Sequence, residues 1–246
     1  MITDNEAQHV NNVKQIFKTI KDRYDFLNHL LSGRRDIAWR KAVVKILSPD
    51  IKAVLDLAAG TGDLTIEIAR RFPDAIVLGA DFVPDMLHLA VEKSKALPKP
   101  ISYVAADALC LPFPDNHFDA VTMAFGLRNI VRKELALSEM TRVVKPGGIV
   151  AVLEMTLPAW WPARLFFHWY LTNVIPFIGS LISRKPSAYE YLSASIHTFL
   201  QPEELSVLFS KAGLINIRAK PLTFGICYLH FGTVAKEPAN IQSPSS

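Results

Sequence analysis

Cysteine is scarce in this chain of 246 residues, which contains only Cys110 and Cys227. Two cysteines are too few for a disulfide framework or for a zinc site with four cysteine ligands. This low number is typical of a protein in the reducing cytoplasm, which is the compartment we expect. The chain also has only 11 glycines and 16 prolines, which excludes collagen-like and low-complexity proteins.

Long runs of one charge are also missing. The 27 basic and 23 acidic residues are mostly interspersed, no block of five or more like charges occurs, and the net charge is +4. A nucleic-acid-binding arm is normally such a basic block. The Asn-Pro-Pro-Tyr type of signature found in base-flipping enzymes is absent as well. We therefore expect no nucleic-acid partner.

No long hydrophobic run predicts a signal peptide, because the first 30 residues lack the necessary apolar segment. The longest apolar stretch without Asp, Glu, Lys or Arg covers residues 165–183, and its length approaches a membrane span. Pro176 and Gly179 interrupt this stretch. We interpret it as a buried or interfacial pair of helices, with a transmembrane helix as the alternative.

Apolar residues, in contrast, are abundant. They make up 50% of the chain, 14 of them are phenylalanines, and the mean hydropathy is +0.21. This amount of apolar surface is sufficient for a large core and excludes global disorder. No internal repeat and no linker-like segment divides the chain. We therefore predict a single domain over residues 1–246.

The first 48 residues are expected to form a helical cap. Apolar residues recur every three or four positions over residues 10–31, which is typical of an amphipathic helix, and a break is expected near Asp25. A second, short helix is predicted over residues 39–47, because Ser48 and Pro49 end it.

Short apolar runs alternate with helical periodicities over residues 49–155. The predicted strands are residues 53–57, 75–80, 101–105, 118–124 and 149–153, and the predicted helices are residues 64–72, 84–95 and 132–144. Strands joined by helices of this length form right-handed βαβ units and a parallel sheet. This segment is the expected cofactor-binding core, because such sheets bind ligands beyond the carboxyl ends of their strands.

The last third of the chain departs from this alternation. Residues 156–200 predict an aromatic helical insertion, and residues 201–236 predict a helix at 203–212 followed by strands at 214–219 and 225–235. The two strands are expected to form a closing antiparallel hairpin, and residues 237–246 a polar tail. The predicted fold class is thus α/β, with a doubly wound, mostly parallel, seven-stranded Rossmann-like sheet.

The turn after the first predicted strand indicates a ligand other than a dinucleotide. Gly60, Thr61 and Gly62 form this turn, which lacks the third glycine of the dinucleotide-binding fingerprint. Asp56 lies near the end of the strand before it. Its negative charge disfavours a pyrophosphate and favours a cationic ligand.

Two further carboxylates follow the next two strands. Asp81 comes 21 residues after Gly60, where an acid can bind both hydroxyls of a ribose, and Asp107 ends the third strand, where it can accept from an adenine amino group. An adenosine with a cationic tail and no phosphates is S-adenosylmethionine, whose product is S-adenosylhomocysteine. The alternative is that these aspartates cap helices or form turns.

Longer motifs make the chain similar to a known family. They are YDFLN (24–28), DLAAGTGDLT (56–65), LPFPDN (111–116), FGLRN (125–129), KPGG (145–148), LE (153–154), PFIG (176–179) and YLSASI (191–196). Over about residues 10–235 they resemble the ubiquinone/menaquinone-biosynthesis C-methyltransferases, which are class I S-adenosylmethionine-dependent enzymes. The combination of FGLRN with YLSASI is the most specific part of this resemblance.

The resemblance implies cofactor contacts at Thr61, Asp81, Asp107 and Ala108, in addition to Asp56, Gly60 and Gly62 of the first turn. It implies transfer of a methyl group to a ring carbon of a prenylated hydroquinone, with no metal. The acceptor is either demethylmenaquinol or the 2-methoxy-6-polyprenyl-1,4-benzoquinol precursor of ubiquinone.

The chain differs from the family pattern at three places. Ala124 replaces a serine that contacts the cofactor, Ala59 replaces a glycine, and Asp36-Ile37 stands where the family often has His-Arg. The first difference removes a hydroxyl from the expected cofactor site. The last bears on which quinol is the acceptor.

Methylation at carbon requires a nucleophilic ring, which loss of a phenol proton provides. Arg128 follows the fourth strand and is our first candidate to hold an oxyanion or orient a water, unless it is a buried brace paired with Asp25 or Glu154. Asn129 could hydrogen-bond a quinol oxygen or cap a helix, and Tyr24 could close the pocket or pack in the core. We predict catalytic roles for Arg128, Asn129 and Tyr24.

The aromatic insertion is expected to meet the lipophilic acceptor. Its aromatic residues could line a prenyl groove, lie in a bilayer interface near Arg164, Arg184 and Lys185, or simply pack in the core; they are Trp160, Trp161, Phe166, Phe167, Trp169, Tyr170 and Phe177. We predict peripheral contact with the inner face of a membrane, and the chain is compatible with a homodimer. A small-molecule O-methyltransferase and a non-catalytic cofactor-binding scaffold subunit remain alternatives.

Overall fold

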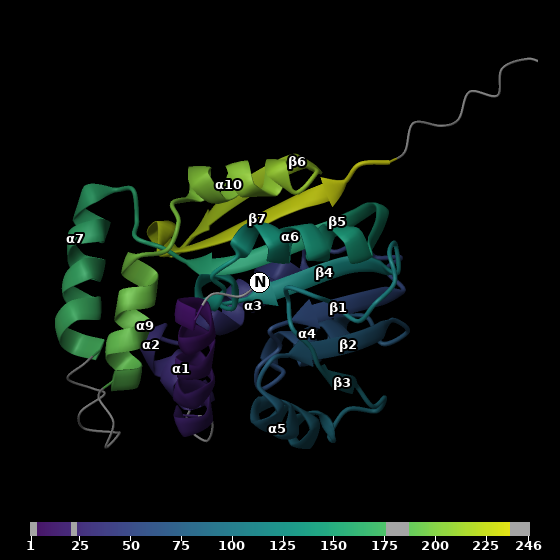
Figure 1. Ribbon diagram of the computed structural model, residues 1–246, viewed down its shortest axis with the longest axis horizontal. Helices are drawn as coiled ribbons and strands as arrows, with labels where there is room; N and C mark the ends of the chain where they lie inside the picture. The colour runs from purple at the N-terminus through teal and green to yellow at the C-terminus, as the bar shows by residue number, and fades with distance from the viewer. Residues whose placement is uncertain (1–3, 21–23, 176–186, 237–246) are drawn as a thin grey trace, which may run out of the picture.

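The computed structural model describes residues 4–20, 24–175 and 187–236, and over these residues it has the predicted α/β fold (Figure 1). One seven-stranded sheet has the order β3-β2-β1-β4-β5-β7-β6. The strands are β1 (Ala53–Leu57), β2 (Ile76–Asp81), β3 (Ser102–Ala105), β4 (Phe118–Ala124), β5 (Val144–Met155), β6 (Leu214–Leu222) and β7 (Cys227–Val234).

Strands β1 to β5 are parallel, and β7 pairs antiparallel with both β5 and β6. The predicted closing hairpin is therefore confirmed. Leu57 at the end of β1 pairs with Ala80 of β2 on one side and with Met123 of β4 on the other. The strand order reverses at β1, so the topological switch point, where such sheets bind ligands, lies between β1 and β4.

Strand β5 begins at Val144, earlier than the predicted residue 149. Residues 145–148, which lay between a predicted helix and a predicted strand, form a bulge inside this strand, because Phe118 pairs with Val144 whereas Ala120 pairs with Ile149. Glycine and proline thus interrupt the ladder without ending the strand.

Helices cover both faces of the sheet (Figure 1). They are α4 (Asp63–Arg71), α5 (Pro84–Ser94), α6 (Lys133–Val143) and α10 (Pro202–Lys211). On one face, Met140 of α6 and Phe209 of α10 are buried with strand residues; on the other, Ile68 of α4 is buried with Trp39 and Val43. Both faces of the central strands are therefore apolar, as expected for a doubly wound sheet.

The predicted helical cap consists of α1 (Asp4–Ile20), α2 (Tyr24–Leu31) and α3 (Arg35–Val44). The predicted break near Asp25 falls at the start of α2, and residues 21–23 before it lie outside the described residues. Helix α3 begins four residues earlier than predicted. The Ser32 hydroxyl accepts the Asp36 N–H at 3.3 Å, and the positive φ of Arg34 (62°) turns the chain into the helix.

The aromatic insertion contains α7 (Trp161–Trp169), the π-helical turn η3 (Tyr170–Val174) and α9 (Ser187–His197). Its inner face forms a separate small core with Phe167, Leu171 and Ile196. The family motif at 176–179, Arg184, Lys185 and the predicted tail lie outside the described residues. Among the helices that the structure describes, none has both the length and the apolar character that a membrane span requires.

Candidate functional site

A cavity of about 300 Å³ lies beyond the carboxyl ends of β1, β2, β3 and β4, beside the switch point. Its polar lining residues are Glu6, Asn11, Asp81, Asp107, Asn129 and Arg132. Helix α1 closes one side with the apolar side chains of Val10, Val13 and Phe17. The volume falls in the range of small-molecule sites, and the position is the one that the fold favours for a ligand.

The turn after β1 approaches this cavity with its backbone. Ala58, Gly60 and Gly62 all have positive φ, at 56°, 56° and 83°. A Cβ at Gly62 would lie 2.8 Å from the hydroxyl of Tyr103, so this position requires glycine both for its φ and for space. Helix α4 starts directly after it. Of these residues, Gly60 lines the cavity, whereas Gly62 shapes the turn.

The turn after β4 closes against the turn after β1. Phe125 has a φ of 59°, an uncommon conformation for a residue with a side chain. A Cβ at Gly126 would come within 2.5 Å of the Ala58 Cβ, so the two turns meet only because Gly126 has no side chain. Ala124, where the family has a serine, lines the cavity with them.

Asp81 ends β2 and faces the cavity, as predicted for a ribose ligand. Its Oδ2 accepts the Gly60 N–H and its Oδ1 accepts the Val83 N–H, each at 2.8 Å. Burial raises the pKa of Asp81, and these backbone donors act in the opposite direction. The carboxylate therefore holds the turn after β1 and leaves acceptor lone pairs for a ligand.

Asp107 and Ala108 follow β3 and line the same cavity. The Asp107 carboxylate accepts the Leu109 N–H at 2.9 Å. Asp107 therefore also stabilises a turn, which was the alternative to a ligand role in the sequence analysis. A turn-forming role and a ligand role are compatible here, because a carboxylate has about four acceptor positions.

Asp56, in contrast, does not line this cavity. Its carboxylate is buried and accepts from the hydroxyls of Thr65 at 2.6 Å and Thr122 at 2.8 Å. It borders a separate small space that it shares with Arg40, Thr61 and other residues of the first turn. Burial raises its pKa to about 6, although the two hydroxyls lower it. Asp56 therefore acts on a ligand only at a distance, through its charge.

The substitution Asp56→Asn should change how stability depends on pH. Because burial raises the pKa of Asp56 from 3.8 to about 6, this group stabilises the fold when protonated, and that contribution is lost as the pH rises through about 6. The shift corresponds to about 3 kcal/mol. The free energy of unfolding of the variant, relative to the parent, should therefore rise by about 3 kcal/mol between about pH 4 and pH 7. Urea denaturation at a series of pH values measures this, and a pH-independent difference would contradict it.

Thr61 contacts the cap instead of the cavity. Its hydroxyl donates to Oδ1 of Asp25 at 2.5 Å, and Oδ2 of Asp25 pairs with Nζ of Lys93 at 2.6 Å. Helix α2, the first turn and α5 are thereby joined. Thr61 can contact a ligand only through other atoms or after this contact has changed.

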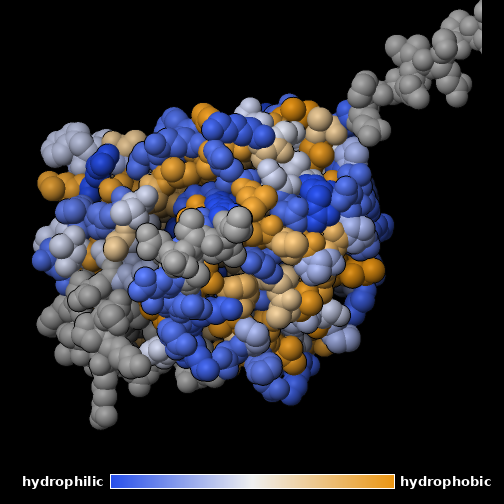
Figure 2. Space-filling model, viewed as in Figure 1, coloured by the Kyte–Doolittle hydropathy of each residue, from blue (hydrophilic) through white to orange (hydrophobic). Residues whose placement is uncertain are grey.

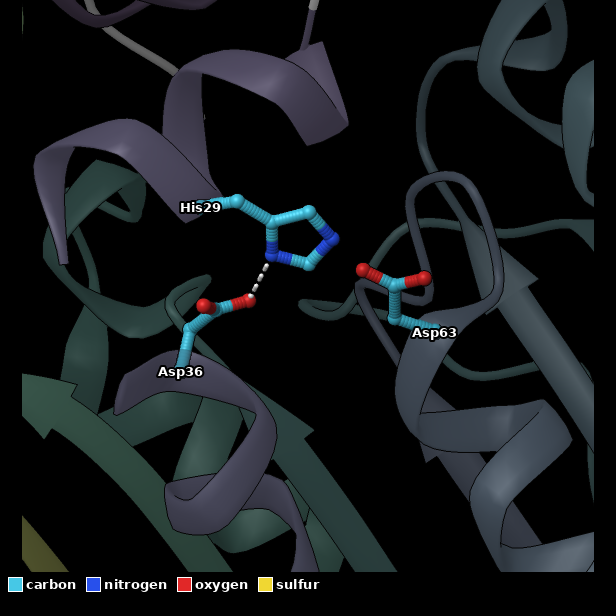
Figure 3. Close-up of side chains that lie close together, drawn as sticks. All are labelled: His29, Asp36 and Asp63. Atoms are coloured by element: carbon cyan, nitrogen blue, oxygen red, sulfur yellow. Dashed lines mark hydrogen bonds and ion pairs between the residues drawn. The ribbon is translucent and has the colours of Figure 1, made fainter. Parts of the chain in front are cut away.

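Three side chains of the cap and the first turn come together in Figure 3: His29, Asp36 and Asp63, whose nearest ligand atoms all lie within 4.8 Å of one another. Nδ1 of His29 contacts Oδ2 of Asp36 at 2.8 Å. Arg40 pairs with Asp36 and lies 3.4 Å from Oδ2 of Asp63. Lys93 also pairs with Asp63, so two cations balance the two carboxylates, and we assign no metal to this cluster.

Arg128 and Glu154 form a buried ion pair. Nη1 of Arg128 contacts Oε1 of Glu154 at 2.5 Å, and the Arg128 N–H donates to Oε2 at 3.2 Å. The side chains are only 5% and 1% exposed. Arg128 lines a second cavity of about 20 Å³, which Phe125 connects to the wall of the first and which Trp39 and Phe167 also line. The alternative that Arg128 forms a buried ion pair is thus confirmed, with Glu154 as its partner.

Asn129 lines the large cavity and has a partner that the sequence did not suggest. The hydroxyl of Tyr191 in α9 donates to Oδ1 of Asn129 at 3.0 Å, and Nδ2 of Asn129 donates weakly to the Phe125 carbonyl at 3.4 Å. These contacts fix which end of the amide is the donor. In the sequence, Tyr191 was noted only as part of a family motif, and its separation of 62 positions from Asn129 gave no local indication of this contact. The side chain of Tyr24 lies outside the described residues.

Charge and shape fit the expected cofactor. Three acids line the large cavity, and its basic lining residue, Arg132, is paired through two contacts with Glu6 of α1 at 2.8 and 2.7 Å. Such a wall suits a cation and suits a pyrophosphate poorly. The Asp81 carboxylate and the backbone of the first turn offer the acceptor and the close approach that an adenosine needs.

Comparisons with known proteins agree with this geometry. Residues 2–234 match the ubiE/COQ5 methyltransferase family. The chain is 45% identical over 218 residues to the demethylmenaquinone methyltransferase of Thermus thermophilus, covering 88% of this chain and 99% of that one. It is 42% identical over 221 residues to the same enzyme of Deinococcus radiodurans, covering 89% and 91%. A solved SAM-dependent methyltransferase of Thermotoga maritima shares the fold, with a TM-score of 0.64 at 19% identity, covering 89% and 98%.

Proposed function

Since the chain belongs to the ubiE/COQ5 methyltransferase family and is an S-adenosylmethionine-dependent methyltransferase, we propose that it methylates a ring carbon of demethylmenaquinol. The observation that supports this best is the cavity at the switch point, which combines the strand-end carboxylate of Asp81 with the apolar wall of α1. One site thus offers a polar end for a nucleoside and an apolar end for a lipophilic ring. The benzoquinol precursor of ubiquinone is not needed to account for the relatives.

The cofactor end of the site is formed by the sheet. When bound, S-adenosylmethionine supplies a methyl group on a cationic sulfur, which needs no metal for activation. Asp81 would accept the ribose hydroxyls, and Asp107 and Ala108 would border the base, as the family resemblance implies. Asp56 adds a nearby negative charge when ionised. Alignment of the reacting atoms in such a closed site can contribute about 7–11 kcal/mol to the lowering of the barrier.

The acceptor end lies where α1 faces the segment after β4. Val10, Val13 and Phe17 provide apolar contact for a ring, and Asn129 is one of the polar residues that line the same cavity. A donor near a quinol oxygen stabilises the phenolate, whose charge spreads onto the ring carbon and makes it nucleophilic. We assign this stabilisation to Asn129, which lines the cavity, and propose that the Arg128 guanidinium, which lines the adjoining small cavity, contributes to it. Because arginine stays protonated, Arg128 acts as a donor and not as the base.

Replacing Tyr191 with phenylalanine should lower kcat while leaving cofactor affinity unchanged. Without the Tyr191 hydroxyl, Oδ1 of Asn129 loses a partner, and the amide is held less firmly in its donor orientation. We expect kcat to fall about tenfold, in line with the loss of one oriented hydrogen bond. Steady-state kinetics and calorimetry with S-adenosylhomocysteine measure the two quantities. Unchanged turnover would show that Tyr191 has no part in positioning.

We further propose that the reaction takes place at the inner face of the cytoplasmic membrane. The prenyl tail of the acceptor partitions into lipid, and the aromatic insertion borders the small cavity at Arg128 through Phe167 and Tyr170.

A direct test uses the purified chain, S-adenosylmethionine with a deuterated methyl group, and demethylmenaquinol, 2-methoxy-6-polyprenyl-1,4-benzoquinol or a catechol as the acceptor. We expect rapid labelling of the naphthoquinol at a ring carbon, located by NMR and mass spectrometry. Label on oxygen would support the O-methyltransferase. Cofactor binding without transfer to any acceptor would support the scaffold subunit.

A further inference from the structure

Six large apolar side chains are exposed at one end of the molecule. They are 52–79% exposed and comprise Trp160, Trp161, Leu165, Phe166, Trp169 and Phe224, which we name the α7–hairpin surface. Helix α7 is apolar on both sides, because Phe167 on its inner side is buried in the small core of the insertion. A surface helix normally has a polar outer face, but in α7 the exposed polar side chains are limited to Arg164 and His168. The inner side is covered by protein, whereas no residue that the structure describes covers the outer apolar side chains.

The exposed side chains come from two segments that are far apart in sequence and meet in space. Phe224 lies in the turn between β6 and β7, and a Cβ at the adjacent Gly225 would lie 3.8 Å from the Cα of Pro158, just before α7. The Thr156 N–H donates to the Ile226 carbonyl at 3.1 Å. Figure 1 shows α7 at the edge of the molecule toward which this hairpin turn points.

The turn holds Phe224 outward. Nε1 of Trp39 donates to the Thr223 hydroxyl at 2.8 Å, which fixes the turn to the cap. Thr223 and Phe224 have φ values of 47° and 57°, so two residues with side chains adopt the left-handed conformation in succession. Such strain is kept where the surrounding structure enforces it, often at a functional position. An exposed aromatic residue in that conformation has no packing reason to be there.

The charged residues near these exposed side chains are basic. The described segments that carry the exposed apolar side chains, residues 156–175 and 214–234, contain Arg164, Arg218 and Lys220 and no Asp or Glu. Arg164, adjacent to Leu165 in α7, and Lys220 in β6, four residues before Phe224, are both exposed. In Figure 2 the same edge of the molecule carries orange and pale side chains next to blue ones.

We propose that the α7–hairpin surface docks the protein on an anionic lipid bilayer. Tryptophans that project from a surface element settle at the level of lipid headgroups, and nearby Arg and Lys side chains attract anionic lipids. The basic residues favour this partner over a second copy of the chain, whose own surface here would be equally basic. The choice of a bilayer as partner rests in part on the proposed function, because a bilayer holds the prenylated acceptor.

The test measures binding to vesicles by flotation. The double variant Trp161→Glu/Phe224→Glu places two carboxylates on the surface, and Ile76→Glu is the matched control, because Ile76 is 67% exposed at the opposite end of the sheet. On vesicles of phosphatidylcholine with phosphatidylglycerol, the parent and Ile76→Glu should float, and the double variant should bind at least about tenfold more weakly. On pure phosphatidylcholine, binding of the parent should also be weaker.

Activity on a soluble, short-tailed demethylnaphthoquinol separates this inference from the proposed function. The double variant should methylate this acceptor at the rate of the parent, since neither residue lines the cavities. Flotation of the double variant at the level of the parent would overturn the docking surface, as would failure of the folded parent to float. A dimer of the parent that the double variant dissociates would instead identify a second copy as the occupant.

Discussion

Asp81→Asn should weaken the binding of S-adenosylhomocysteine by about 10²–10³-fold. The carboxylate accepts N–H groups of Gly60 and Val83, and an amide would oppose one of these donors with its own N–H group. The variant also loses the charged acceptor proposed for the ribose hydroxyls. A hydrogen bond to a charged group contributes about 1.5–3 kcal/mol, and an unsatisfied buried donor costs about 1–3 kcal/mol. Their sum of about 2.5–6 kcal/mol corresponds to about 10²–10⁴-fold at 1.4 kcal/mol for each factor of ten. We expect the lower part of this range, because the opposed donor also destabilises the protein without ligand.

Calorimetric titration of the purified variant measures this loss. Asp74→Asn is the control, because Asp74 is exposed and precedes β2 at the opposite end from Asp81. It should bind like the parent. Thermal unfolding without ligand must accompany the titration, since Asp81 also holds the first turn. A folded Asp81→Asn protein that binds as tightly as the parent would remove Asp81 from the cofactor site.

Arg128→Leu should lower the free energy of unfolding by about 3–5 kcal/mol, because it leaves the Glu154 carboxylate buried without its guanidinium. The double variant Arg128→Leu/Glu154→Leu removes both charges. Since apolar replacement of a buried ion pair is often neutral or stabilising, we expect its stability to return close to that of the parent. This recovery separates the structural role of Arg128 from its chemical role.

The activity of the stable double variant then tests the chemical role. We expect kcat to remain about 10²-fold below that of the parent, the effect of removing one donor to a developing oxyanion, while S-adenosylhomocysteine binds normally. Single-turnover kinetics with demethylmenaquinol provide the measurement. A double variant that is as active as the parent would show that Arg128 has only a structural role, as the partner of Glu154.

The strands β1 and β4 could be predicted to the residue because their apolar runs end at turn residues, and the alternation with helices predicted the sheet. The face of a strand on which a side chain lies could not be predicted in the same way. In β1, residues 54–57 are all buried. No alternation of polar and apolar residues therefore indicated on which face of the sheet the Asp56 side chain lies. It faces Thr65 and Thr122 and not the large cavity.

Contacts across long sequence separations were the other limit. Asp81 and Gly60 could be joined because parallel strands bring their carboxyl ends together. The partners of Arg128 and Asn129 depend on how β5 and the insertion pack against the turn after β4, and no periodicity encodes that packing. Sequence did identify Glu154 as one of two partners for Arg128. It also identified the aromatic segment, but not its division into a buried and an exposed side.

The quinones of cells that lack this chain provide the most direct test of the central claim. Mass spectrometry should show a naphthoquinone lighter than menaquinone by one CH₂ group, and the gene for the parent chain should restore menaquinone whereas Asp81→Asn should not. A quinone composition that is unchanged by the loss of the chain would contradict the account.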